Sequence, residues 1–191
     1  MVFVLFFTKV WYIHPTKRRL RMKKTLFICS IFLAFLIAAS ASADIITLSI
    51  STPNSGVSAY PAPYADVTVN RTSSTTATIT FAADLTGGYQ YHMGGAQATD
   101  VNVNATTFTV ANLTNYVSPT VGSGNADGFG KFNLTIDNFD GATSSKLSLS
   151  FDLTDTSGTW ASASDVLTPD ADGYLAAAHI FVTGHGLELG S

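Results

Sequence analysis

The feature that most restricts the fold of this chain is a series of short alternating segments that begins at residue 44. Each segment is rich in Val, Thr, Ile or Phe and is bounded by Gly, Pro, Asn, Asp or Ser, and no long stretch has a helical period. Many short alternating strands between turn residues are typical of all-β sandwiches. The sequence therefore predicts a single antiparallel β-sandwich, jelly-roll-like, over residues 44–191.

The expected strands share this alternation and end at turn residues. They are Ile45–Ile50, Ala65–Asn70, Thr76–Ala83, Tyr89–His92, Thr99–Val103, Phe108–Leu113, Lys131–Asp137, Lys146–Leu153 and Ala176–Thr183. A helical turn is expected within Ala161–Leu167.

Matching the apolar faces of neighbouring segments predicts three hairpins, because a slip of one residue would turn every apolar side chain to water. One pairs Val69 with Ala77, and a second pairs Val103 with Phe108. The third pairs residues 131–137 with 146–153 so that Lys131 faces Asp152.

The N-terminal residues predict export. Residues 22–43 run from basic through apolar to small side chains, which is the order of a helical signal peptide, with cleavage between Ala43 and Asp44. The apolar run is shorter than the roughly 20 residues of a spanning helix, so no membrane anchor is expected in the mature chain. Residues 1–21 are interpreted as a spurious upstream extension. We expect a periplasmic, cell-surface or extracellular protein that meets the export machinery through its signal peptide.

Charge excludes one class of partner. The chain beyond residue 43 keeps three of the 10 Lys and Arg and all 13 Asp and Glu, which gives a net charge of −10. Nucleic-acid binding needs clustered cations to neutralise phosphates, so it is not expected. An anionic membrane surface is disfavoured for the same reason.

Candidate groups for catalysis are sparse. The mature chain has His92, His179 and His185 but no G-x-S-x-G motif, and it lacks the His and Cys spacing of a zinc site. His179 lies in an apolar run and is expected to be a strand residue. The sequence therefore predicts a protein that is not an enzyme and has no required cofactor.

Calcium is the metal with the most candidate ligands, since it prefers carboxylate and amide oxygens. Two segments supply such groups: Asn125, Asp127 and Asp140 in one, and Asp170 and Asp172 in the other. The same Asp-Gly pairs are common turn chemistry, and neither segment has the spacing of an EF-hand. The residue pattern favours turns and leaves calcium as the alternative.

Aromatic side chains suggest a saccharide-binding face as a further alternative. The candidates are Tyr60, Tyr64, Tyr89, Tyr91, Tyr116, Trp160 and Tyr174, and among them Tyr91 and Trp160 are the proposed glycan contacts. Large aromatic side chains more often fill cores, so a core role is favoured for Trp160.

Several motifs in order resemble one bacterial family. They are Asp127–Ile136, Phe139–Gly141, Ser157–Ala161 with Asp165–Leu167, and Ala177–Val182. This set is similar to the body of PEP-CTERM proteins, which are exported proteins handled by exosortase in Gram-negative bacteria that make extracellular polysaccharide. The resemblance spans about residues 60 to 183 and implies a secreted surface or matrix protein without known catalysis.

The C-terminal residues depart from that family. Its members end in a Pro-Glu-Pro motif, a membrane-spanning helix and a basic cluster, whereas residues 184–191 read GHGLELGS. We expect either a truncated or frameshifted gene or a copy that is released freely. The predicted function is a non-catalytic structural or adhesive component associated with exopolysaccharide, with a carbohydrate-binding or calcium-dependent binding module as the alternative.

Overall fold

The alternating segments form antiparallel sheets in the computed structural model of the chain, which describes residues 44–138 and 141–184. Within these residues no α-helix forms. The elements are β1 (Asp44–Ile50), β2 (Ala65–Arg71), β3 (Thr76–Ala83), β4 (Leu85–Thr86), β5 (Tyr89–Met93), β6 (Thr99–Val101), β7 (Phe108–Thr114), β8 (Thr120–Ala126), β9 (Gly130–Asp137), η1 (Ala142–Ser144), β10 (Ser148–Asp155), η2 (Ala163–Asp165), β11 (Ala176–Ala177) and β12 (Ile180–Gly184). The mostly β, antiparallel character that the sequence predicted is confirmed.

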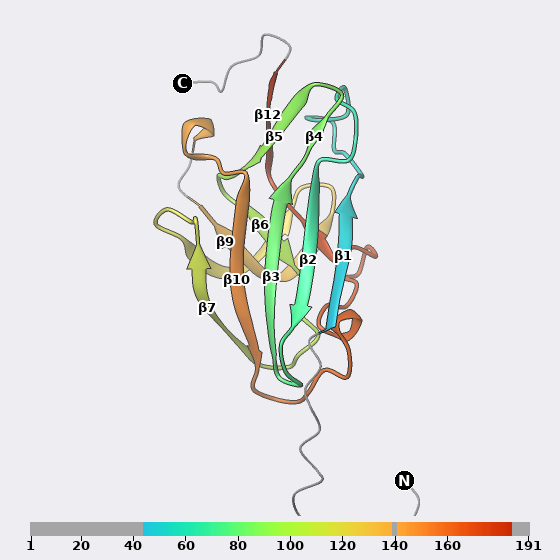
Figure 1. Ribbon diagram of the computed structural model, residues 1–191, viewed down its shortest axis with the longest axis vertical. Coiled ribbons are helices and arrows are strands. Elements are labelled where there is room, and N and C mark those ends of the chain that lie inside the picture. The colour runs from blue at the N-terminus through green and yellow to red at the C-terminus, as the bar shows by residue number, and fades with distance from the viewer. Residues whose placement is uncertain (1–43, 139–140, 185–191) are drawn as a thin grey trace, which may run out of the picture. The chain divides into compact units, whose positions relative to one another are not determined.

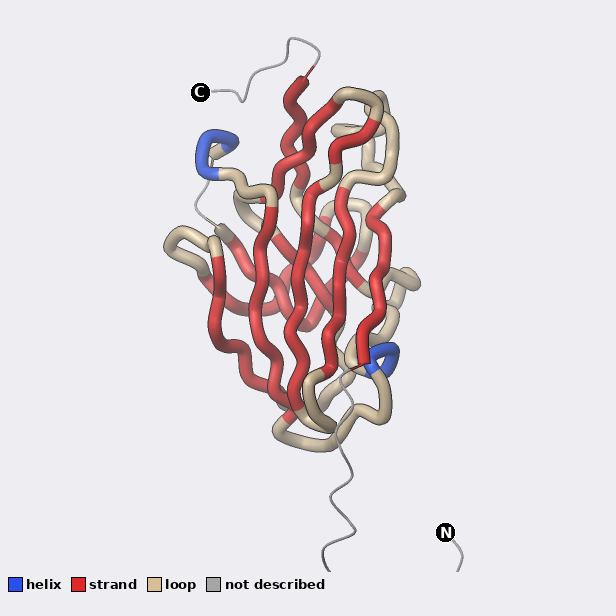
Figure 2. Tube along the Cα trace, in the orientation of Figure 1, coloured by secondary structure: helices blue, strands red, loops and turns tan. Residues whose placement is uncertain are grey.

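The strands are arranged in a sandwich-like stack of sheets. One sheet has the order β1-β2-β3-β10-β7, a second has the order β11-β6-β9-β8, and a three-stranded sheet has the order β12-β5-β4. Figure 1 shows the five-stranded sheet in front of β6 and β9, and Figure 2 shows how little helix joins the strands. Strands β1 and β11 each form an edge of their sheet.

The main core lies between the two larger sheets, because alternate residues of both point inward. The pattern of burial along β10 alternates strictly, with Leu149, Phe151 and Leu153 at most 1% exposed. Leu134 and Ile136 of β9 belong to the same cluster of contacts. Burying a large apolar side chain contributes about 1.5–3 kcal/mol, so this alternation accounts for much of the driving force.

The first predicted hairpin forms with a different register. Strands β2 and β3 pair as expected, but Val69 faces Ile79, two residues beyond the predicted Ala77. The slip of two residues keeps every apolar side chain on the inner face. Apolar matching alone cannot distinguish such registers.

The other two predicted hairpins are wrong. Strand β6 pairs with β9 and β11, not with β7, and β9 pairs with β6 and β8, not with β10. The predicted partners face each other across the core in different sheets, which satisfies the same apolar faces. Asp152 consequently accepts hydrogen bonds from Thr78 Oγ1 at 2.6 Å and Asn112 Nδ2 at 2.7 Å, and Lys131 faces Asn125.

Two strand assignments also need correction. The predicted strand Ala176–Thr183 is two strands, β11 and β12, which belong to different sheets and are separated by Ala178 and His179. Strand β8 was missed because its sequence TVGSGNA is rich in glycine and serine, which lower β propensity. The expected helical turn is present as η2, where Ser162 and Asp165 form a reciprocal capping box.

Candidate functional site

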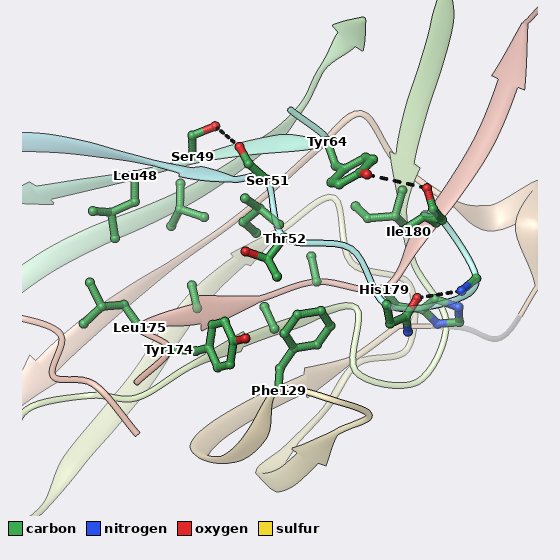
Figure 3. Close-up of a pocket in the computed structure, with 18 of the residues that line it drawn as sticks. Leu48, Ser49, Ser51, Thr52, Tyr64, Phe129, Tyr174, Leu175, His179 and Ile180 are labelled. Atoms are coloured by element: carbon green, nitrogen blue, oxygen red, sulfur yellow. Dashed lines mark hydrogen bonds between the residues drawn. The ribbon is translucent and has the colours of Figure 1, made fainter. Parts of the chain in front are cut away.

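An open cleft of about 460 Å³ lies between the edges of the two larger sheets. One wall comes from the end of β1 and the loop after it, and the other comes from β11 and its neighbours (Figure 3). The lining residues are Leu48, Ser49, Ile50, Ser51, Thr52, Asn54, Gly56, Val57, Tyr64, Val67, Phe129, Gly173, Tyr174, Leu175, Ala176, Ala177, Ala178, His179 and Ile180. A site of this volume at a sheet edge is suited to a small or extended ligand.

Two aromatic rings form one wall of the cleft. Phe129 and Tyr174 are half-buried, and their ring centroids lie 5.2 Å apart with an interplanar angle of 84°. They pack on a small apolar cluster of Ala126, Phe132 and Ala177. The rings are therefore supported from behind while part of their surface stays accessible.

Local backbone geometry fixes both rings. Phe129 lies in the turn between β8 and β9, where its N–H donates to Ala126 O at 2.9 Å. Tyr174 closes a short loop in which Asp170 Oδ1 accepts from the N–H groups of Asp172 at 3.0 Å and Tyr174 at 2.9 Å. This wall is therefore held by turn chemistry that brings together two segments far apart in sequence.

Polar side chains form the opposite wall. Ser49, Ser51, Thr52 and Asn54 are exposed, and Figure 3 shows Ser51 and Thr52 across the cleft from Phe129 and Tyr174. The hydroxyls of Ser49 and Ser51 lie 3.1 Å apart, and Asn54 Oδ1 accepts from Gly56 N at 3.0 Å. Hydroxyl and amide groups can thus meet a ligand opposite the aromatic wall.

The far end of the cleft is bounded by Tyr64 and His179. The Tyr64 hydroxyl donates to Tyr60 O at 3.1 Å, and its ring packs edge-on against Tyr91. His179 is exposed, stacks on Phe181 with centroids 4.8 Å apart, and has its Nδ1 3.2 Å from Ala96 O. His179 is therefore not a buried strand residue, because it lies between β11 and β12.

The two predicted glycan contacts lie elsewhere. Tyr91 is fully buried and hydrogen-bonds Pro61 O, while Trp160 is 2% exposed and its Nε1 donates to Asn104 O at 2.8 Å. Neither ring presents a face to solvent. The aromatic surface of the cleft comes instead from Tyr174, which was one of several candidates, and from Phe129, which sequence reasoning missed.

The predicted calcium ligands do not converge as one set. Asn125 and Asp127 are exposed near the β8–β9 turn, and Asp140 lies outside the described residues. Asp170 and Asp172 both direct an Oδ2 over Gly130, where a Cβ would overlap with them. No group of three or more His, Cys, Asp or Glu among the described residues is placed to hold a metal ion.

The remaining described histidine has a hydroxyl partner. His92 Nε2 lies 3.1 Å from Thr183 Oγ1, and burial lowers the pKa of His92. His185 lies outside the described residues. The contacts of His92 and His179 are thus with a threonine and a backbone carbonyl.

A buried carboxyl group lies directly beside the strand that lines the cleft. Asp100 of β6 is 1% exposed and faces Ala177 of β11 and Thr135 of β9. Thr135 Oγ1 donates to its Oδ1 at 2.5 Å, while its Oδ2 is buried without a hydrogen-bond partner. Burial raises the pKa of Asp100 to about 7, the Thr135 hydrogen bond opposes this, and the charge of Asp137 adds to it.

The predicted cleavage site meets the described chain at its first residue. Asp44 begins β1, and its Oδ2 accepts from Ala163 N at 2.7 Å, whereas Ala43 and the segment before it lie outside the described residues. In the part of the chain that is described, no helix is long and apolar enough to cross a membrane.

Comparisons with known proteins give no relatives. The chain matches no protein-family model, and it matches neither a curated protein nor a solved structure. Any functional argument therefore starts from the cleft itself.

Proposed function

We propose that this chain is an exported, non-catalytic surface or matrix protein that binds extracellular polysaccharide in the cleft between β1 and β11. The observation that carries the proposal is the composition of the cleft, with Phe129 and Tyr174 on one wall and hydroxyl and amide groups on the other. An adhesive role in the matrix follows from this binding.

A saccharide fits both walls at once. Sugar rings have apolar C–H faces that pack on aromatic side chains, and hydroxyl edges that hydrogen-bond to polar ones. A purely apolar ligand would remove Ser51, Thr52 and Asn54 from water without replacing their hydrogen bonds, which is unfavourable. The mixed lining is therefore best matched by a ligand with one apolar and one polar face.

Compartment and family are part of the same proposal. The signal-peptide pattern of residues 22–43 and the resemblance to PEP-CTERM proteins support export in a Gram-negative bacterium that makes exopolysaccharide. For the fold we propose a β-sandwich of jelly-roll type. The strand order supports it, because β7 and β10 lie in the five-stranded sheet while their neighbours along the chain, β6, β8, β9 and β11, lie in the four-stranded sheet.

A glycan array probed with the full chain tests the proposed function. We expect retention on at least one saccharide, and loss of retention in Ser51→Trp, which places a bulky ring in the cleft. Ser123→Trp is the matched control, because Ser123 is an exposed residue of β8 that does not line the cleft. This variant should bind saccharide like the wild type. Retention on no saccharide, or equal binding by Ser51→Trp, would contradict the proposal.

A further inference from the structure

We propose that the cleft selects uncharged saccharides and rejects chains of uronic acids or sulfated sugars, an inference that rests on the proposed function. The protein would then bind neutral segments of a matrix even where acidic polysaccharide is present. Three features of the described residues carry this proposal: the cleft lining, the acids beside it and the positions of the cations.

The lining offers no Lys or Arg partner for an anionic ligand. Among the described residues that line the cleft there is no Asp, Glu, Lys or Arg; hydroxyl, amide and aromatic groups supply most of its polar surface, and the imidazole of His179 lies at one end. A carboxylate that enters such a site loses water without gaining an ion pair, which is costly. A neutral hydroxyl meets no such penalty, because serine, threonine and asparagine side chains can replace its hydrogen bonds.

Acidic side chains flank the aromatic wall. Asp127 is exposed two residues before Phe129, and Asp172 is exposed two residues before Tyr174. The Oδ2 atoms of Asp170 and Asp172 meet over Gly130, beside Phe129. Charges within a Debye length of about 8 Å act on a bound ligand at physiological salt, so this rim repels anions.

The three Lys and Arg residues beyond residue 43 do not line the cleft. Arg71 faces Asp44 at the opposite end of the β1–β2 pair from the cleft, and Lys146 pairs with Met93. Lys131 follows Gly130 on β9, faces Asn125 of β8 and does not line the cleft. None of the Lys and Arg side chains beyond residue 43 therefore lines the cleft to attract a polyanion.

The test compares a neutral and an acidic saccharide on the full chain. The probes are dextran oligosaccharides and alginate oligosaccharides, titrated by calorimetry at low salt and at about 0.5 M NaCl, each with EDTA and with calcium. We expect the neutral probe to bind at least about tenfold more tightly in every condition. High salt should narrow the gap, because it screens the rim.

Two variants of equal net charge separate the rim from the overall acidity of the protein. Asp127→Asn with Asp172→Asn removes two of the three negative charges of the rim, whereas Thr109→Lys with Thr114→Lys makes the same change in net charge on exposed positions of β7. The rim variant should improve alginate binding by about three- to tenfold and leave dextran binding unchanged. The β7 variant should change neither by more than about twofold.

The outcomes distinguish the two levels of the proposal. Tighter binding of alginate than of dextran, with or without calcium, would overturn the inference while leaving saccharide binding intact. Equal gains from the rim and β7 variants would also overturn it, because net charge alone would then explain the selectivity. If neither dextran nor alginate binds and the glycan array also shows no ligand, both the proposed function and the selectivity inference are contradicted.

Discussion

Aromatic side chains occur both in the closed interior of this molecule and at its open edge, but they differ in exposure. Between the two larger sheets, Phe81, Phe151 and Trp160 are at most 2% exposed and contribute by burial. At the edge, Phe129 and Tyr174 are only half-buried and pack on a separate small cluster. The rings between the two larger sheets are closed to a ligand, whereas the two rings at this edge keep accessible surface beside the cleft.

The largest effect on stability is expected from Trp160→Ala, which tests the role of the buried rings. We expect it to lower the free energy of unfolding by about 3–5 kcal/mol, because it removes a buried ring and the hydrogen bond to Asn104 O. Urea denaturation of the full chain measures the loss. Tyr174→Ala should cost less than half as much and weaken saccharide binding; an equal loss of stability would break the distinction between interior and edge.

A second test concerns the buried carboxyl group of Asp100. Its pKa is about 7 in the folded protein against 3.8 ordinarily, so the native state keeps a proton that the unfolded chain releases between these values. The unfolding free energy should therefore fall by a few kcal/mol as the pH rises from about 4 to about 7. Asp100→Asn should remove most of this slope in urea titrations.

The control for that slope is an exposed carboxyl group at the edge. Asp172→Asn leaves Asp100 unchanged, so the pH dependence should persist. A wild-type slope in Asp100→Asn would show that another group carries the titration.

The smallest expected effect is the difference in stability cost between alanine substitutions at two glycines near the cleft. Gly173 has a φ of +95° with open space around it, so Gly173→Ala should cost about 1 kcal/mol of backbone strain. Gly130 has a φ of +88°, and its new Cβ would also overlap with the carboxylates of Asp170 and Asp172. Because Asp170 is held by two N–H groups, Gly130→Ala should cost about 2 kcal/mol.

Thermal unfolding of the two glycine variants in parallel measures this difference. Equal shifts in Tm would mean that Asp170 and Asp172 move aside freely. The aromatic wall would then be less firmly held than its hydrogen bonds indicate.

The candidate site was only partly predictable from the sequence. Tyr174 was recognised as an aromatic candidate, and the turn role of Asp170 is confirmed by its two backbone hydrogen bonds. Phe129 gave no separate signal, because its accessibility depends on Tyr174, 45 positions along the chain, and on the edge at β11. The exposed serines of the other wall were equally hidden among the many serines of the chain.

By itself the sequence determined the antiparallel β class, most strand positions and the inward face of each strand, because alternation and turn residues act locally. Only the tertiary structure decided which strands pair, where Ala176–Thr183 divides, and which aromatic rings stay accessible. An inward Phe or Leu is equally well buried by a neighbour in its own sheet or by one in the sheet opposite. That choice depends on packing across the whole core, and the cleft at the unpaired edges of β1 and β11 is its consequence.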